Sequence, residues 1–200
     1  MNIVAIANQK GGVGKTTTAI NLSACVAACG RRTLIIDLDP QGNTTSGLGI
    51  DKNTKRPAIY DVLINRIPLQ DAVIPTPMKG LSIAPANISL AGAEVELVSE
   101  IAREYFLKRA LAEVKDEFDD VFIDCPPALG LLTLNALAAA DKLLVPIQCE
   151  FFALEGLTNL MSTVALVHKH LNPNLAVEGV VMTMFDKQTN LSRQVVAEVQ

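Results

Sequence analysis

Aromatic residues are scarce in this chain of 200 residues: tryptophan is absent, and aromatic side chains make up only 4% of the total. Half of the residues are nonetheless apolar, so the core must consist mainly of Ile, Val, Leu and Ala. Such a core is typical of a parallel β-sheet covered by helices. The length suits one α/β domain and is short for two, so we expect a single domain over residues 1–200.

A strong charge of either sign is also missing, since the net charge at pH 7 is only −4. This balance does not indicate a nucleic-acid-binding protein, so any contact with DNA would require a local basic patch. No basic segment followed by a long apolar run stands at the start, and we therefore predict no signal peptide. The most apolar stretch, residues 128–140, is too short to span a bilayer. We expect a cytoplasmic protein that does not bind membranes.

Cysteines with the spacing of a metal-binding or redox motif are missing too. The four cysteines form no Cys-x-x-Cys motif and lie in apolar segments; they are Cys25, Cys29, Cys125 and Cys149. This pattern predicts reduced, buried thiols in a cytoplasmic protein.

Apolar runs with the pattern of buried strands alternate along the chain with helical patterns. The predicted strands cover residues 3–7, 33–36, 121–123, 143–145 and 176–184, with shorter candidates around Val73 and at 81–83. The predicted helices cover residues 16–29, 58–65, 94–115, 154–170 and the segment after Asn190, while residues 41–57 are predicted to form a loop. This alternation predicts an α/β fold with a doubly wound, mostly parallel sheet and helices on both faces.

A glycine-rich segment directly after the first predicted strand carries the clearest functional signal. It reads Lys10-Gly11-Gly12-Val13-Gly14-Lys15-Thr16-Thr17. Glycines let successive backbone N–H groups point inward, and the following helix presents its positive end to the same point, which makes a phosphate cradle. We expect Lys15 to contact the terminal phosphates of a nucleotide and the Thr16 hydroxyl to bind Mg²⁺. A turn of this kind could also bind nothing, but the preceding strand and the Lys-Thr pair favour a P-loop NTPase.

The segment departs from the usual G-x-x-x-x-G-K-[ST] pattern. Gln9 stands where the first glycine is expected, and Lys10 is an additional lysine within the loop. A lysine before the glycines is poorly oriented toward phosphates bound by its own loop. It is better placed to reach the site of a partner subunit, as an arginine finger does in trans. This interpretation requires a face-to-face homodimer with nucleotide between the subunits.

Carboxylates follow two of the predicted strands. Asp124 ends one apolar run, and we expect it to hold Mg²⁺ through a water molecule. Asp39 opens the polar loop after another run, where it could orient the attacking water and approach the metal. Asp37 lies two residues earlier on the same strand face and is a further candidate for the metal shell. Each aspartate alone could be a turn residue at a strand end, and the phosphate cradle is what favours functional roles.

Taken together, these motifs resemble the ParA/MinD group of ATPases, which carry a deviant Walker A box. Residues 10–17 match that box, the segment from Asp37 to Asn43 resembles its switch I, and the segment from Val121 to Pro127 resembles its Walker B motif and switch II. Three further segments, residues 80–87, 93–97 and 145–156, are similar to the chromosomal ParA/Soj branch. The resemblance extends over essentially the whole chain.

This resemblance implies a DNA-segregation ATPase with slow intrinsic turnover that uses ATP and Mg²⁺. Such proteins form an ATP-dependent sandwich dimer, bind DNA nonspecifically on the nucleoid, and are switched off when a ParB-type partner stimulates hydrolysis. Carried over by motif, Lys10 is the trans-acting signature lysine, and Lys15 is the lysine that binds phosphate in cis. Thr16 is the magnesium ligand, Asp39 the hydrolytic aspartate, and Gly11 lies at the close dimer contact.

Two departures from the family pattern concern the last part of the chain. Family members continue beyond it with a strand, further helices, and loops that contact adenine and DNA, so we expect a shortened domain that lacks these elements. An arginine common in the family is replaced by Gln188. Lys187 and Arg193 are the remaining basic candidates for contacts with the DNA backbone, and they could equally be solvated surface charges.

Two other functions remain open at this point. A MinD-like, membrane-associated positioning ATPase shares the nucleotide machinery but normally carries a C-terminal amphipathic helix. An iron–sulfur reductase component would need two cysteines per subunit facing a dimer axis, and only Cys125 lies near a switch segment.

Overall fold

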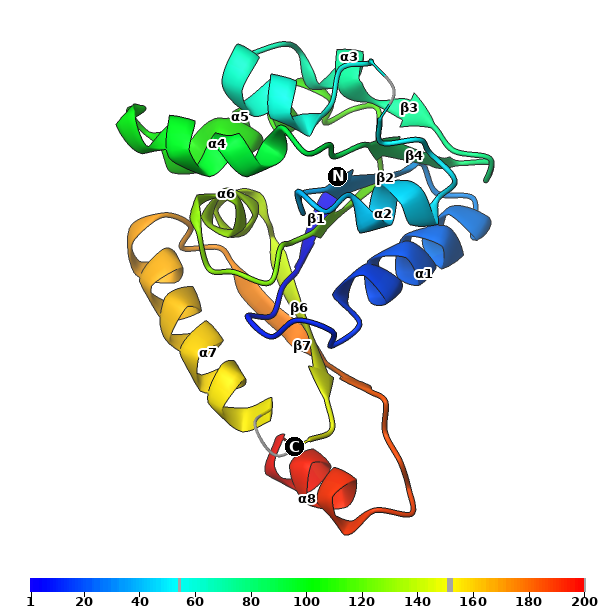
Figure 1. The fold of residues 1–200 in the computed structure, drawn as a ribbon, viewed down its shortest axis with the longest axis vertical. Coiled ribbons are helices and arrows are strands. Elements are labelled where there is room, and N and C mark those ends of the chain that lie inside the picture. Colours follow the sequence, from blue (N-terminus) through cyan, green and yellow to red (C-terminus); the bar gives the residue numbers. More distant parts are fainter. Residues whose placement is uncertain (54, 151–152, 200) are drawn as a thin grey trace.

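In the computed structural model, which describes residues 1–53, 55–150 and 153–199, seven described strands form one sheet (Figure 1). Their order is β3-β4-β2-β5-β1-β6-β7, and only β3 and β4 pair antiparallel. Their bounds are β1 Asn2–Ile6, β2 Thr33–Asp37, β3 Ile74–Pro75, β4 Leu81–Ala84, β5 Asp120–Asp124, β6 Lys142–Gln148 and β7 Ala176–Thr183. The expected doubly wound, mostly parallel sheet is therefore confirmed.

Helices cover both faces of this sheet. In Figure 1, α1 and α2 lie on one side, and α6 and α7 lie on the other. The α-helices are α1 Lys15–Ala28, α2 Asn43–Gly47, α3 Leu69–Ala72, α4 Leu90–Glu96, α5 Phe106–Glu113, α6 Leu131–Ala139, α7 Ala153–His170 and α8 Asn190–Val199. Shorter π or 3₁₀ turns are η1 Asp61–Asn65, η2 Leu97–Ser99 and η3 Arg103–Tyr105. None of the helices in the described ranges is long and apolar enough to cross a membrane.

The alternation of side chains along the strands divides the core into two layers. Ile3 and Leu34 belong to the larger layer, which includes residues of α5, α6 and α7. Val4, Ile35 and Phe122 point to the opposite face, where they pack with Ala19 and Ala27 of α1. The central strands β2 and β5 are buried along their whole length, as expected for parallel strands covered on both faces.

The register of the central strands positions the functional residues. β1 lies between β5 and β6, and β2 lies on the other side of β5. Ile6 and Asp37 are each paired with Asp124, so β1, β2 and β5 end at the same level. The loops that follow these three strands therefore meet at one edge of the sheet, where ligands bind in doubly wound folds.

One local prediction was wrong in detail. The segment 41–57, expected to be a loop, contains α2, which begins after Gly42 in a left-handed conformation (φ 63°). This helix is short and polar, so no hydrophobic period indicated it. The segment 94–115, expected to be helical with room for a break, is divided into α4, η2, η3 and α5. Ala102, with a φ of 55°, interrupts the helical path there.

Candidate functional site

The glycine-rich loop turns directly from β1 into α1. Gly12 (φ 74°) and Gly14 (φ 86°) adopt the left-handed conformation that glycine accepts without strain. Gly14 is the N-cap of α1, and no side chain caps the helix. The first N–H groups of α1 therefore face the loop without a capping side chain, and together with the helix dipole they favour an anion. This geometry is what the predicted phosphate cradle requires.

Neighbouring strands hold this loop in place. The Asn8 side chain accepts a hydrogen bond from the Lys10 N–H (3.0 Å) and donates one to the carbonyl of Pro146 in β6 (2.7 Å). The Thr183 hydroxyl, at the end of β7, donates to the Val13 carbonyl (2.9 Å). The loop is thus bound to both β6 and β7, which preorganises it for a ligand.

Lys15 lies at the bottom of the cradle and is only 7% exposed. Its ammonium group donates a hydrogen bond to the Lys10 carbonyl (3.0 Å). Burial lowers the pKa of Lys15, whereas the nearby Asp124 and Asp39 carboxylates act in the opposite direction. The lysine thus lies beside the acidic strand ends and supplies positive charge where phosphates would bind.

Asp124 joins the start of α1 to α2. Its Oδ2 accepts hydrogen bonds from the hydroxyls of Thr16 (2.8 Å) and Thr44 (2.6 Å). Its Oδ1 is buried and has no hydrogen-bond partner. Burial raises the pKa of this carboxyl group, and the two hydroxyls partly offset the effect. A buried carboxylate oxygen without a partner, next to a threonine hydroxyl, is an arrangement that fits a hydrated Mg²⁺ ion.

Asp37 has a different environment although it is the register partner of Asp124. Its Oδ2 accepts hydrogen bonds from the Thr45 N–H (2.8 Å) and hydroxyl (2.6 Å), and its Oδ1 accepts one from the Asp39 N–H (3.2 Å). Burial is the main cause that raises the pKa of Asp37 to about 7. Because both oxygens are engaged, Asp37 anchors α2, and Asp124 is the better placed of the two for a metal.

Asp39 lies at the entrance to the loop after β2. It is 9% exposed, and its Oδ1 accepts a hydrogen bond from the Gln41 N–H (2.9 Å). It lines a cavity of about 230 Å³ together with Pro127, from the loop after β5, and Glu94 of α4. Asp39 therefore faces the space between the two segments that resemble switch loops.

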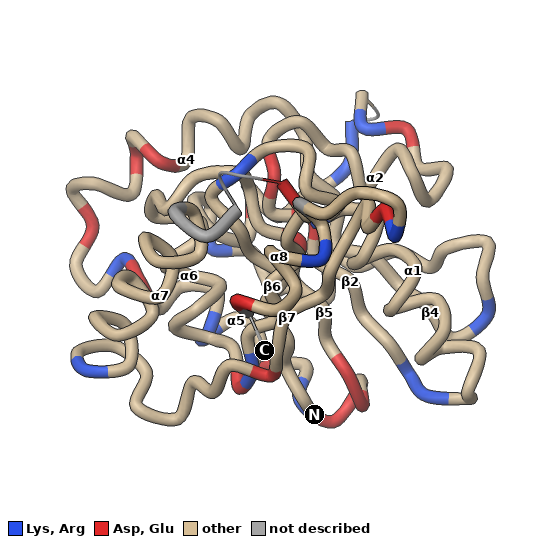
Figure 2. The backbone as a smooth tube through the Cα atoms, turned by 90° about the horizontal axis from the view of Figure 1, so that it is seen from below, with Lys and Arg blue, Asp and Glu red and all other residues tan. Residues whose placement is uncertain are grey.

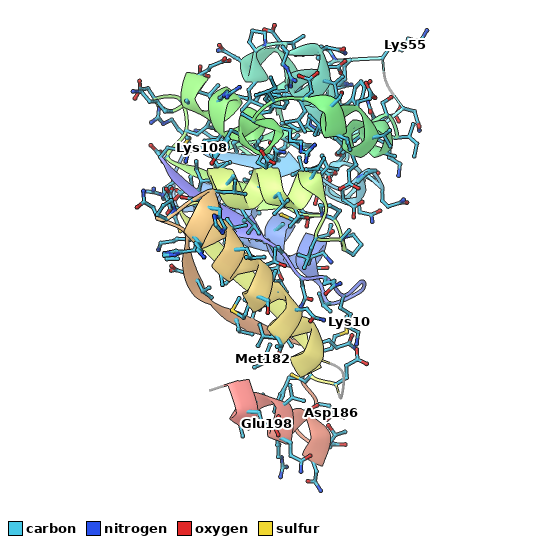
Figure 3. All side chains as sticks on the ribbon, turned by 90° about the vertical axis from the view of Figure 1, so that its left-hand side faces the viewer. Lys10, Lys55, Lys108, Met182, Asp186 and Glu198 are labelled. Carbon is cyan, nitrogen blue, oxygen red and sulfur yellow. The ribbon has the colours of Figure 1, made fainter. Side chains whose placement is uncertain are left out.

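Lys10 forms an ion pair that the sequence did not indicate. Its Nζ lies 2.6 Å from Oε1 of Glu150, and the two side chains are 33% and 38% exposed. Figure 3 shows Lys10 at the edge of the molecule near the start of α7, far from Lys108. An ion pair this exposed is worth at most about 1 kcal/mol, so Lys10 can leave it at little cost.

The structure thus brings most of the predicted site residues to one edge of the sheet. Sequence reasoning missed four polar residues that support them, namely Asn8, Thr44, Thr45 and Thr183. Thr44 and Thr45 directly follow the switch-I-like segment, which was the available signal. The matched segment 145–156 includes Phe151 and Phe152, which lie outside the described residues.

The two candidates for DNA contact lie elsewhere, before and within α8. The Arg193 guanidinium donates hydrogen bonds to the Lys187 carbonyl from Nε (3.1 Å) and Nη2 (2.7 Å). Both residues are exposed. Arg193 therefore stabilises the loop before α8.

The cysteines only partly match the prediction of buried thiols. All four are free; Cys125 and Cys149 are buried, but Cys25 and Cys29 on α1 are exposed. Within residues 1–53, 55–150 and 153–199, no group of three or more His, Cys, Asp or Glu residues could hold a metal ion.

Comparisons with known proteins identify the family of this chain. A family model described as an AAA domain matches residues 1–177. The sporulation initiation inhibitor protein Soj of Bacillus subtilis (strain 168) is 56% identical over 197 residues, which cover 98% of this chain and 78% of Soj. The chromosome partitioning protein ParA of Myxococcus xanthus (strain DK1622) is 55% identical over 197 residues, which cover 98% of this chain and 70% of ParA.

Among solved structures, one titled cobyrinic acid a,c-diamide synthase from Mycobacterium smegmatis, with bound ADP and magnesium, superimposes with a TM-score of 0.95. It is 44% identical, and the match covers 100% of this chain and 81% of that one. Identity above 50% to curated relatives, over most of their length, establishes the family. The chain therefore belongs to the ParA/Soj family of chromosome-partitioning proteins.

Proposed function

We propose that this protein is a Mg²⁺-dependent ATPase that segregates DNA. The observation that carries the proposal is the arrangement around Asp124: its partnerless oxygen lies beside the Thr16 hydroxyl, in the cradle that contains Lys15. A structural relative binds ADP and magnesium, which supports the same ligands here. The backbone N–H groups of Gly11 to Thr17 would hold the phosphates, and Lys15 would neutralise their charge.

Hydrolysis requires the protein mainly to position groups and to neutralise charge. When bound, Mg²⁺ would supply positive charge that offsets the negative charge of the phosphates. Thr16 would bind the ion directly and Asp124 through water, while Asp39 at the cavity between the switch segments would orient the attacking water. Lys10 would leave Glu150 and reach the nucleotide of a second subunit, with Gly11 at the close contact between subunits.

The proposal extends to partners. In the ATP state two copies would form a sandwich dimer that binds DNA nonspecifically on the nucleoid, and a ParB-type protein would stimulate hydrolysis and release it. Lys187 and Arg193 are the proposed contacts with the DNA backbone, and their exposure to solvent is compatible with this role. The match to Soj and ParA favours this function over a MinD-like role at the membrane.

Analytical ultracentrifugation with ATP, with ADP and without nucleotide tests the proposal. We expect a dimer only with ATP, and we expect that dimer to co-sediment with DNA of unrelated sequences and not with lipid vesicles. Asp39→Ala should bind ATP and dimerise but not hydrolyse it. A monomer under all conditions, or ATP turnover at the wild-type rate in Asp39→Ala, would contradict the mechanism.

A further inference from the structure

Two adjacent threonines of α2 link this short helix to the ends of two strands. Thr44 and Thr45 are both fully buried. The Thr44 hydroxyl donates a hydrogen bond to Oδ2 of Asp124 on β5 (2.6 Å), and the Thr45 hydroxyl donates one to Oδ2 of Asp37 on β2 (2.6 Å). Figure 1 and Figure 2 both show α2 beside β2. Each threonine therefore ties α2 to a different carboxylate.

The Thr45 contact is an anchor that does not involve the phosphate cradle. The Thr45 N–H also donates to Oδ2 of Asp37 (2.8 Å), and the Thr45 hydroxyl accepts a hydrogen bond from the Ala86 N–H (3.0 Å) in the loop after β4. Three hydrogen bonds at one buried residue hold α2 to β2 and to that loop. Thr45 thus fixes α2 on the side away from the cradle.

The Thr44 contact reaches the candidate metal site instead. Oδ2 of Asp124 accepts hydrogen bonds from Thr44 and from Thr16 (2.8 Å), whereas Oδ1 of Asp124 is buried without a partner. Thr16 and Asp124 are the residues proposed to hold Mg²⁺, so Thr44 bonds directly to a carboxylate of that site. Groups that hydrogen-bond to such a carboxylate fix its orientation and that of the metal.

A tight turn connects α2 to Asp39. The Gly42 N–H donates to the Asp39 carbonyl (2.9 Å), and the Gln41 N–H donates to Oδ1 of Asp39 (2.9 Å). Gly42 has a left-handed φ of 63° and is the N-cap of α2, directly before Asn43 and Thr44. Because these bonds leave little slack between Asp39 and the start of α2, a displacement of Thr44 would also displace Asp39.

We propose that the Thr44 hydroxyl is a positioning group for ATP hydrolysis: it docks α2 on Asp124 and thereby holds Asp39 in the orientation that directs the attacking water. This inference rests on the proposed function and adds the residue that joins the metal site to Asp39. The Thr44 hydroxyl donates its proton to Asp124 and not to a phosphate. Its removal should therefore slow hydrolysis much more than it weakens ATP binding.

Single-turnover hydrolysis and equilibrium ATP binding, both at saturating Mg²⁺, test the proposal in Thr44→Val, which removes the hydroxyl and keeps the branched shape. Loss of such a supporting hydrogen bond typically costs roughly 10–100-fold in activity, so we expect a rate constant at least about tenfold lower and a Kd for ATP within about threefold of wild type. Thr44→Ser keeps the hydroxyl and should recover the wild-type rate. Thr44→Ala also lacks the hydroxyl and should show the same loss, and it replaces Thr44→Val if that variant does not fold.

Thr33→Val is the matched control. Thr33 is also fully buried, and its hydroxyl donates to the Arg31 carbonyl (3.2 Å), but it lies at the start of β2, at the opposite end of the strand from Asp37. This variant should hydrolyse ATP at the wild-type rate. Urea unfolding verifies that each variant is folded.

Hydrogen exchange in the nucleotide-free protein gives a second readout that does not depend on activity. The Ser46 and Leu48 N–H groups of α2 and its C-cap donate to the carbonyls of Gly42 and Thr44. If the Thr44 hydroxyl docks α2, these two amides should exchange several-fold faster in Thr44→Val than in wild type. Thr33→Val should leave their exchange unchanged.

Each outcome bears on the inference. A rate constant for Thr44→Val close to that of wild type, or unchanged exchange at Ser46 and Leu48, would overturn it and leave the proposed function intact. An equal loss of rate in Thr33→Val, or no recovery in Thr44→Ser, would also overturn it, because packing and not the hydroxyl would then be responsible. A rise in the Kd for ATP that matches the loss of rate would assign Thr44 to nucleotide binding instead. Wild-type protein that neither binds nor hydrolyses ATP would reject the proposed function, and this inference with it.

Discussion

Replacing Lys15 by alanine provides the sharpest test of the phosphate cradle. The ammonium group lies in a pocket only 7% exposed, where it donates to the Lys10 carbonyl and lies near Asp124 and Asp39. A charge-assisted hydrogen bond to a bound phosphate contributes about 1.5–3 kcal/mol. Removal of the lysine also leaves the nearby carboxylates without a compensating charge, and they would then repel the nucleotide.

A total loss of about 3 kcal/mol corresponds to a Kd for ATP roughly 100-fold higher or more. The assay is a fluorescence titration with a labelled ATP analogue in the presence of Mg²⁺. Lys108→Ala is the control, because Lys108 is an exposed lysine on α5 far from the loop (Figure 3). Circular dichroism would verify that both variants are folded.

A Kd for Lys15→Ala within about threefold of wild type would refute the assignment, since so small a change is well below the 1.5 kcal/mol expected from one charge-assisted hydrogen bond. An equal loss in Lys108→Ala would also refute it, because the effect would then reflect net charge alone.

Three further predictions follow from the site. Lys10→Ala should bind ATP with unchanged affinity but lose turnover, because its partner Glu150 lies outside the cradle; unchanged single-turnover kinetics would argue against a role in trans. The pKa of Asp37 is raised from an ordinary 3.8 to about 7. At a pH between these two values the carboxyl group is therefore protonated in the native state and ionised in the unfolded chain. Unfolding free energy should therefore fall as pH rises through this range, by up to about 1.4 kcal/mol per pH unit, and urea titrations should show a shallower fall in Asp37→Asn. Burial raises the pKa of the Cys125 thiol, so a thiol reagent should modify exposed Cys25 and Cys29 rapidly and Cys125 only on unfolding.

Local patterns in the sequence were sufficient for the fold class and for the position of the cradle. The apolar runs around Ile3, Leu34 and Phe122 predicted buried strands because parallel strands covered on both faces need apolar side chains throughout. The glycine-rich loop was recognised because its conformation requires glycine at positions such as Gly12 and Gly14, both of which have a positive φ. These requirements are local, so the sequence expresses them directly.

Contacts between distant segments could not be predicted in the same way. The hydrogen bonds of Asp124 to Thr16 and Thr44 join residues 108 and 80 positions apart. The sequence favoured Asp124 for the metal and indicated Asp37 only as a further candidate. It could not show that Asp37 anchors α2 or that Asp124 retains a partnerless oxygen, because these environments are built by residues from other segments. The pairing of Lys10 with Glu150 likewise depends on where β6 ends relative to the loop after β1.

The sequence by itself determined that a phosphate-binding loop follows the first strand of a parallel sheet, because glycine content and hydrophobic period act over a few neighbouring residues. Only the tertiary structure decided which carboxylate is available to a metal and which threonine of α2 bonds to it. Both depend on the register of β2 against β5 and on the packing of helices over the sheet, where residues far apart in the chain share one environment.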